Sequence, residues 1–231
     1  MLQASTIINK KQIPTEILGK TFEQFICKVF HTPFVGNYKY NMDKADKLSA
    51  RIQKLRSIFP HELAHTAAKG ARYDFTGLDN TDIKLSAKTT KSNNKVCPQV
   101  IGQPSKKKFC EHFGITDNST DIKEYIQDNV NSMLEKYFEY TFDCPIVYYN
   151  EKKDFALFVT TIMTIDWSSY KIDFSHRRNN TGKWNESTSI SIDGLNIGEF
   201  QLHNHRDNIK FRWNFVNILE KFNKHFEIVS L

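Results

Sequence analysis

The segment from Tyr73 to Lys88 constrains the fold of this chain more than any other stretch. Its middle, Leu78 to Asp82, is rich in Asp and Asn, which tolerate the positive φ that tight turns need. The residues after this turn alternate between apolar and polar side chains, namely Ile83, Leu85 and Ala87 against Lys84, Ser86 and Lys88. Alternating side chains of a strand point to opposite faces. The segment therefore predicts a β-hairpin.

This hairpin would bring a carboxylate close to a lysine. Asp74 on the first strand can lie beside Ser86 and Lys88 on the second. A carboxylate, a second oxygen ligand and an ammonium group can bind Mg²⁺ and activate a water molecule against a phosphodiester. The hairpin is therefore the first candidate site.

Composition favours a folded protein with a polyanionic partner. The 231 residues suit one or two domains, and 18 Phe and nine Tyr exclude a disordered chain. Thirty-two Lys and Arg against 26 Asp and Glu give a net charge of +6 and a pI near 9.0. This balance favours nucleic acid over a membrane.

The cysteines and the hydropathy indicate a reduced, cytoplasmic protein. The four cysteines form no C-x-x-C pair, which is typical of inert thiols in a reducing compartment. No apolar run is long enough to span a membrane, and residues 1–12 lack the apolar core of a signal peptide.

Hydrophobic spacing predicts a mixed α/β (α+β) fold around one central sheet. Three helices are expected, at Thr15–Phe30, Lys44–Ile58 and Asp121–Phe138, with Thr15 as N-cap of the first and a short helix or turn at Pro60–Ala68. Further β-structure is expected at Pro145–Tyr149, Asp154–Ile165, Ser169–Phe174, Glu199–His203 and Ile209–Phe215, followed by a short helix to Phe226. His176–Glu186 is expected to be a polar excursion, and Lys106–Lys108 a charged loop or a phosphate contact.

A rival motif lies just before the hairpin. His61-Glu62-Leu63-Ala64-His65 matches H-E-x-x-H, in which two histidines on one face of a helix bind zinc and the Glu acts as general base. Pro60 places His61 at a helix start, and the x-x-G-x-x-H extension is missing. A zinc metallopeptidase using His61, Glu62 and His65 stays an alternative.

Three segments carry recognisable patterns, namely Leu18–Ile26, Glu62–Asp74 and Lys88–Val96. They resemble segments of type II restriction endonucleases of the PD-(D/E)xK superfamily, particularly the MspI/HhaI group. Leu18–Ile26 (LGKTFEQFI) is similar to the L-G-K-x-aromatic-E-x-aromatic-I segment of the group's first helix. Glu62–Asp74 resembles an acid-L-x-x-T-x-A-x-G segment that leads into the first metal-binding Asp. Lys88–Val96 resembles the catalytic lysine and its Ser- and Lys-rich recognition loop.

The resemblance implies an activity and a setting. It implies a mixed central sheet flanked by helices and Mg²⁺-dependent, sequence-specific hydrolysis of double-stranded DNA to 5′-phosphate ends. The expected setting is the cytoplasm of a bacterium, where a DNA methyltransferase of the same restriction–modification system protects the host DNA. Residues 1–115 would form the catalytic core, and residues 116–231 a helix and a β-hairpin-rich DNA-recognition part packed on it, or all of them a single domain. The protein would be a monomer or a homodimer.

The resemblance also assigns site residues. Catalytic roles fall on Asp74, Ser86, Lys88 and Glu23, and metal binding on Asp74, Glu23 and Asp82. Ser86 stands where most of the superfamily has Glu or Asp, which removes one charge from the site. Asp82 and Glu23 are candidates to restore it, and Asp74 with Asp82-Ile83-Lys84 is an alternative frame.

DNA contacts are expected from two regions. In the group the loop after the lysine enters the groove, so we expect contacts from Lys91, Ser92, Asn93, Asn94, Lys95 and Gln99. The last hairpin places polar residues on one strand face, which suits a DNA-binding ribbon, namely Gln201, His203, Lys210, Arg212 and Asn214. Sequence-independent phosphate contacts are expected from Lys106, Lys107, Lys108, Arg177 and Arg178. A non-catalytic nucleic-acid-binding module that retains this fold is the second alternative.

Overall fold

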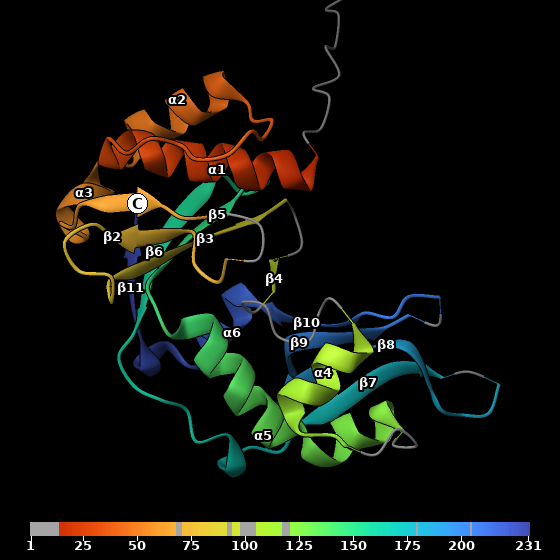
Figure 1. Cartoon of the computed structure of the whole chain (residues 1–231). Coiled ribbons are helices and arrows are strands. Elements are labelled where there is room, and N and C mark those ends of the chain that lie inside the picture. The colour runs from red at the N-terminus through yellow and green to blue at the C-terminus, as the bar shows by residue number, and fades with distance from the viewer. Residues whose placement is uncertain are drawn as a thin grey trace, which may run out of the picture.

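A computed structural model describes residues 14–67, 71–91, 94–97, 105–116, 121–178, 180–203 and 205–231. Two β-sheets organise this part of the chain (Figure 1). Helices α1 (Thr15–Phe30), α2 (Met42–Arg51) and α3 (Lys54–Ile58) lie on the outer face of the first sheet. Helices α5 (Ile122–Phe142) and α6 (Phe215–Lys221) pack in the core between the two sheets.

The first sheet has six strands, in the order β1-β2-β3-β5-β6-β11. Their bounds are Leu63–His65, Phe75–Gly77, Lys84–Thr90, Ile146–Asn150, Phe155–Thr161 and Phe226–Ser230. Only β3 and β5 run parallel, with Lys88 opposite Tyr148; the other described neighbours are antiparallel. The sheet is therefore mixed, as predicted.

The second sheet has five strands, in the order β4-β10-β9-β8-β7, and all described pairs are antiparallel. Their bounds are β4 Lys95–Val96, β7 Asp173–Arg178, β8 Trp184–Ile192, β9 Leu195–Leu202 and β10 Ile209–Asn214. Helix α4 (Lys106–Phe113) and the 3₁₀ turns η1 (Trp167–Ser169) and η2 (Asn223–His225) complete the described elements.

Each face of the first sheet covers its own core. On one face, α1 buries Leu18, Phe22 and Phe25 against strand residues that include Leu85. On the other, Tyr148 packs among aromatic residues of α5, α6 and the second sheet. Burial of large aromatic side chains on both faces fixes the sheet between two helical layers.

Several predicted elements are confirmed. Helix α1 has the expected bounds, although it begins at Thr15 after Pro14 and no side chain caps it. The hairpin of β2 and β3 forms around the predicted turn. Helix α5 extends four residues beyond the predicted Phe138, and the Asp121 carboxylate caps its N-terminus. Strands β5 and β6 lie within or close to their predicted segments.

Other predictions are wrong. The expected helix Lys44–Ile58 is divided into α2 and α3, because the backbone at Ile52 leaves the helical conformation (φ −115°, ψ 35°) while the side chain stays buried. Pro60–Ala68 contains strand β1 instead of a helical turn, because pairing with β2 overrides its weak local preference. Lys106–Lys108 form the first turn of α4, which the Ser105 hydroxyl caps, and are not a loop.

The predicted mixed sheet flanked by helices is present, but a second sheet that the sequence did not predict accompanies it. His176–Glu186, expected to be an excursion, contributes to β7 and β8 of a second sheet. The first sheet takes strands from both sides of residue 115, because β5, β6 and β11 join β1–β3. The division of the chain at that residue stays a prediction. Among the described helices, none is long and apolar enough to cross a membrane.

Candidate active site between α1 and the β2–β3 hairpin

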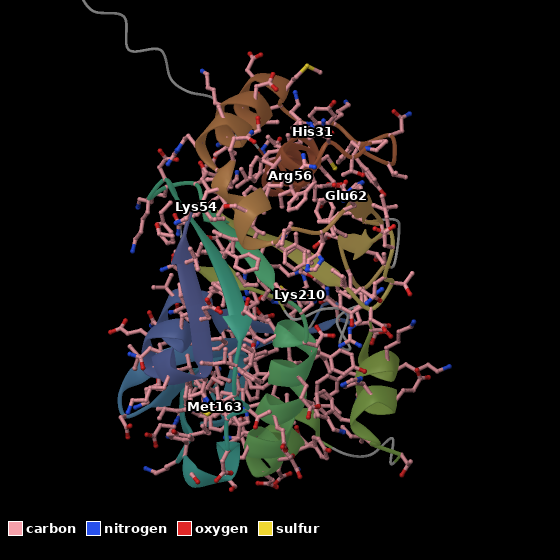
Figure 2. All side chains as sticks on the ribbon, turned by 90° about the vertical axis from the view of Figure 1, so that its left-hand side faces the viewer. His31, Lys54, Arg56, Glu62, Met163 and Lys210 are labelled. Atoms are coloured by element: carbon pink, nitrogen blue, oxygen red, sulfur yellow. The ribbon has the colours of Figure 1, made fainter. Side chains whose placement is uncertain are left out.

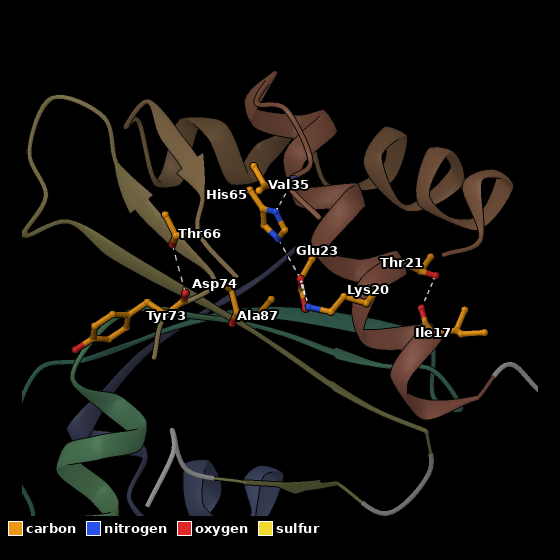
Figure 3. Close-up of polar contacts among 10 residues, drawn as sticks. All are labelled: Ile17, Lys20, Thr21, Glu23, Val35, His65, Thr66, Tyr73, Asp74 and Ala87. Carbon is orange, nitrogen blue, oxygen red and sulfur yellow. Dashed lines mark hydrogen bonds and ion pairs between the residues drawn. The ribbon is translucent and has the colours of Figure 1, made fainter. Parts of the chain in front are cut away.

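Asp74 lies where strands β2 and β3 separate. Phe75 pairs with Leu85, so continued pairing would place Asp74 opposite Ser86. Instead, the Asp74 carboxylate accepts a hydrogen bond from the backbone N–H of Ala87, with Oδ2 and N 2.8 Å apart (Figure 3). The Thr66 N–H donates to the Asp74 carbonyl at 2.8 Å. The side chain and the backbone of Asp74 are thus both held in place.

The turn of this hairpin is built around Gly77. A Cβ atom there would come within 2.4 Å of the Asn80 carbonyl oxygen, so only glycine fits this approach. The Asn80 side chain accepts the N–H of Asp82 at 2.8 Å and shapes the turn locally. The pairing of β2 with β3, and with it the place of Asp74, depends on this turn.

The charges around Asp74 identify its neighbours. Burial raises the pKa of the Asp74 carboxyl, and the nearby negative charge of Glu23 raises it further. The positive charges of Lys88 and Lys20, together with the Ala87 N–H, act in the opposite direction. Two carboxylates, from Asp74 and Glu23, and two ammonium groups, from Lys88 on β3 and Lys20 on α1, therefore lie close enough to interact at the Asp74 carboxyl. Asp74, Glu23 and Lys88, predicted from different segments, are brought together here.

Glu23 is held by two basic side chains. Lys20, one helical turn earlier on α1, places its Nζ 3.0 Å from Oε1 and 2.8 Å from Oε2. The Nε2 atom of His65, on β1, lies 3.0 Å from Oε2 (Figure 3). Lys20 also lies over the Tyr38 ring, 4.4 Å from its centroid. The carboxylate is thus fixed in a site that is mostly closed to solvent.

Ser86, on strand β3 two positions before Lys88, is fully buried. Its hydroxyl accepts a hydrogen bond from the Cys144 thiol, with Sγ and Oγ 3.7 Å apart. Burial raises the pKa of Cys144 to about 12, so the thiol stays protonated and unreactive at neutral pH. Ser86 thus packs at the base of the site, at the position where the resemblance expects an acid.

Asp82 is not brought to the site. It is exposed in the turn, four residues before Ser86 on a strand that rises about 3.3 Å per residue. Lys84 of the alternative frame lies over the Tyr73 ring, 5.4 Å from its centroid. The structure thus does not place Asp82 or Lys84 with Glu23 and Lys88 around the Asp74 carboxyl.

The structure also disagrees with zinc binding by His61, Glu62 and His65. A zinc-binding H-E-x-x-H needs one helix face, whereas Leu63–His65 is a strand. Glu62 is exposed and pairs with Arg56, 3.1 Å away, at the surface (Figure 2). His61 packs its ring edge-on against Phe59. Nothing in this geometry directs the three side chains at one metal ion.

The predicted polar face of the last hairpin exists, but an acid lies at its centre. Strand β10 alternates buried and half-buried residues, which puts Lys210, Arg212 and Asn214 on one face. Glu199 on β9, opposite Arg212, forms an ion pair with Lys95 and lies 3.4 Å from the Arg212 guanidinium. Gln201 donates to Glu199 at 2.7 Å. We call Lys95, Glu199, Gln201 and Arg212 the Glu199 cluster.

Electrostatics keep the cluster's acid ionised. Burial alone would raise the pKa of Glu199, but hydrogen bonds from Lys95 and Gln201 and the charge of Arg212 hold that pKa below its usual value. Within the described residues, the Arg212 Nε and the Asn214 Oδ1 are buried without a hydrogen-bond partner. The face is therefore a preassembled polar surface with mixed charge, and not a purely basic ribbon.

Asn94, expected to contact bases, joins the two sheets. Its Oδ1 accepts from the Asn150 amide at 2.6 Å and from the Tyr148 hydroxyl at 3.4 Å. Its carbonyl accepts the N–H of Phe215 at 2.8 Å. With a φ of 55°, Asn94 adopts the left-handed conformation that Asn tolerates. Its side chain is occupied by protein groups.

The remaining predicted DNA contacts are scattered. Lys106, Lys107 and Lys108 are exposed on α4, and Lys107 lies 3.9 Å from Glu111. Lys91 is half-buried at the end of β3, and His203 lies 3.5 Å from Glu186. Arg178 ends β7, whereas the Arg177 side chain is not among those described. Ser92, Asn93 and Gln99 lie outside the described residues.

Sequence reasoning missed three residues of these sites. Lys20 lies three positions before Glu23, a spacing that brings side chains together on a helix. Glu199 and Gln201 are two positions apart on one strand, so their side chains lie on the same face of the sheet. His65 was considered only as a zinc ligand, and no sequence signal links it to Glu23, 42 positions away.

The residues of the α1–hairpin site fit a hard divalent cation. Among the described residues, no group of three His, Cys, Asp or Glu side chains gathers, so a cation would have two protein carboxylates here, Asp74 and Glu23. Both are oxygen donors, which Mg²⁺ prefers. Burial and mutual repulsion disfavour the ionised form of Asp74, and a cation would offset both effects.

Comparison with known proteins identifies a close relative. The chain is 45% identical over 221 residues to the type II restriction enzyme CviAII of Paramecium bursaria Chlorella virus 1. The alignment covers 94% of this chain and 63% of the relative, so the chain spans less than two thirds of that enzyme's length. No family model and no solved structure matches the chain. The chain is thus similar, along nearly all of its own length, to a type II restriction enzyme.

Proposed function

We propose that this protein is a type II restriction endonuclease that hydrolyses phosphodiester bonds in double-stranded DNA at a specific sequence. One observation supports this most: Asp74 and Lys88 lie together with Glu23 where β2 and β3 separate. The 45% identity to a type II restriction enzyme supports the same activity independently of the geometry.

Each residue of the site would have a distinct role. Asp74 and Glu23 would hold a divalent cation, Mg²⁺ in our proposal, which supplies Lewis acidity toward a phosphate oxygen and a bound water. The Lys88 ammonium would orient the attacking water and stabilise negative charge that develops on the scissile phosphate. Ser86, whose hydroxyl accepts a hydrogen bond from the Cys144 thiol, would help to hold strand β3 in place and adds no charge.

The site lacks the second strand acid of the PD-(D/E)xK pattern. Glu23, on α1 instead of β3, would supply the missing negative charge, since it lies near enough to raise the pKa of the Asp74 carboxyl. Membership of that superfamily, near the MspI/HhaI group, stays part of the proposal. Its support is the Asp74…Ser86-Ala87-Lys88 spacing and the mixed sheet flanked by helices.

The second sheet would read the DNA. Arg212, Gln201 and Asn214 offer the hydrogen-bonding groups that recognise purine edges in the major groove. The exposed lysines of α4 would contact phosphates without regard to sequence. Strand β4 follows β3 after four residues, so a base-reading surface and the catalytic strand are directly linked in the chain.

The biological setting follows from the activity. A nuclease of this type requires protection of the host's own DNA, so we propose a DNA methyltransferase of the same sequence specificity as its functional partner. The relative belongs to a virus, so a bacterial source is not required by the comparison. A soluble cytoplasmic location and a monomeric or homodimeric state remain predictions.

Digestion of a sequenced plasmid with Mg²⁺, followed by mapping of the fragment ends, tests this proposal. We expect discrete fragments with 5′-phosphate ends at one repeated sequence. Lys88→Ala should slow cleavage strongly while DNA binding persists, and Lys84→Ala, on the same face of the strand near the turn, is the matched control. Protein that shifts DNA but never cuts it with any divalent ion would instead indicate a non-catalytic binding module.

A further inference from the structure

We propose that His65 is a positioning residue that fixes the Glu23 carboxylate for cation binding by donating a hydrogen bond from Nε2. The inference deepens the proposed function and rests on the role given there to Glu23. It reassigns a histidine that the sequence offered only as a zinc ligand.

The contacts of the ring select one tautomer. The Nδ1 atom of His65 lies 2.9 Å from the backbone nitrogen of Val35. A backbone N–H can only donate, so Nδ1 must carry its lone pair. In the neutral ring the proton then belongs to Nε2, which faces Glu23 Oε2 at 3.0 Å (Figure 3). A backbone group therefore makes His65 a donor toward the carboxylate.

Packing holds the ring in this orientation. The His65 side chain is 0% exposed. Its ring stacks on Phe34 with centroids 4.6 Å apart and an interplanar angle of 18°, and it packs against Phe75 at 5.2 Å. Rotation of the imidazole would break both hydrogen bonds and displace two aromatic contacts. His65 is thus preorganised before any ligand arrives.

The two partners of Glu23 differ in what they would do when a cation binds. The Lys20 ammonium contacts both carboxylate oxygens and carries the same sign of charge as a metal ion. It must therefore give up at least part of this contact. His65 is neutral in the selected tautomer and contacts Oε2 alone, so its hydrogen bond can persist. His65 would keep the carboxylate in position while Lys20 moves aside.

The size of the effect follows from comparable arrangements in metalloproteins. Removing a hydrogen-bond partner of a metal ligand typically weakens metal affinity or activity about 10–100-fold. Glu23 without His65 would rotate toward Lys20, which would be its remaining described side-chain partner. We expect weaker cation binding, with a smaller effect on DNA binding, because His65 belongs to the first sheet and the predicted base contacts to the second.

Mn²⁺ binding to the full chain without DNA, measured by electron paramagnetic resonance, tests the inference. His65→Ala and His65→Gln should each bind Mn²⁺ about 10–100-fold more weakly than the wild type. His61→Ala, in the same five-residue motif but packed on Phe59, should bind like the wild type. In a Glu23→Gln background the effect of His65→Ala should largely disappear, because both changes act on one contact.

Nitrogen-15 NMR of the histidine rings provides a readout that does not depend on the metal. We expect the His65 signal of a neutral ring protonated at Nε2. A ring protonated at Nδ1, or folded His65 variants with wild-type Mn²⁺ affinity, would overturn the role of His65 and leave the proposed nuclease intact. A wild type that binds no Mn²⁺ would also overturn the role of His65, and cleavage mapping of the plasmid with Mg²⁺ then shows separately whether the proposed nuclease fails with it.

Discussion

Replacing Asn94 tests whether this residue joins the two sheets or reads DNA. In the structure its side chain accepts hydrogen bonds from Asn150, which is fully buried, and from Tyr148. Removal of the acceptor leaves the Asn150 amide with one long contact to the Tyr148 hydroxyl, at 3.4 Å. An under-satisfied buried polar group of this kind costs about 1–3 kcal/mol.

Conformation adds a second cost for alanine alone. The φ of 55° at Asn94 is disfavoured for residues with a Cβ by roughly 1–2 kcal/mol, which Asn partly escapes and Gly avoids. We therefore expect Asn94→Ala to lower the free energy of unfolding by about 2–5 kcal/mol. Asn94→Gly should lose only the hydrogen-bond contribution, about 1–3 kcal/mol.

Urea unfolding followed by circular dichroism measures both values. For a protein of this size each kcal/mol also corresponds to roughly 2–4 °C in Tm. Asn223→Ala, an exposed residue of η2, is the matched control and should change stability by less than about 0.5 kcal/mol. Wild-type stability in both Asn94 variants, together with lost discrimination between DNA sequences, would refute the structural role and restore Asn94 as a base contact.

Three further predictions concern the active site and the Glu199 cluster. Lys88→Ala should slow cleavage about 10²–10⁴-fold at unchanged DNA affinity, measured by single-turnover digestion beside gel-shift titration. The raised folded-state pKa of Asp74 means that its carboxyl lowers stability as pH rises from the unfolded pKa, about 4, toward the folded one. Asp74→Asn should therefore be more stable than the wild type at neutral pH in EDTA. Thermal melting of both proteins from about pH 4 upward measures this difference. The reasoning would be contradicted if the stability of the two proteins fell equally as the pH rose. Glu199→Gln should release Lys95 and Arg212 from their acid, so that binding to random DNA tightens and its salt dependence steepens by about one charge, a slope change near 0.9. An unchanged slope would mean that these cations do not meet phosphates.

The hairpin and the first helix could be predicted from sequence because their signals are local. Alternation of apolar and polar residues around an Asp- and Asn-rich turn predicted β2 and β3. The spacing of Leu18, Phe22 and Phe25 predicted the buried face of α1. Asp74 and Lys88 followed, since antiparallel pairing leaves few positions where the two can meet. These parts of the site depend on contacts between near neighbours in the chain.

What the sequence did not predict depends on distant contacts. Strand β1 carries too few residues for a local pattern and forms because β2 offers a partner. His65 contacts Glu23 because β1 lies beside α1. In the sequence, the H-E-x-x-H pattern indicated zinc binding by His65 instead of this contact. Strand β11 was missed for the same reason, since it pairs with β6 more than 60 positions earlier.

The Glu199 cluster shows a different limit. Alternation correctly placed Lys210, Arg212 and Asn214 on one face. This polar face suggested a DNA-binding ribbon, but the register also brings the acid Glu199 directly opposite Arg212. Charge on a sheet face is set by cross-strand pairs, which a single strand's sequence does not contain.

Affinity cleavage by Fe²⁺ tests the central claim most directly, because Fe²⁺ in a Mg²⁺ site cuts the backbone close to its ligands when ascorbate and peroxide are present. The account predicts scission near Glu23, near Asp74 and between Ser86 and Lys88, and loss of all these cuts in Asp74→Asn. Cuts confined to the second sheet, or an unchanged pattern in Asp74→Asn, would contradict a cation site between α1 and the β2–β3 hairpin.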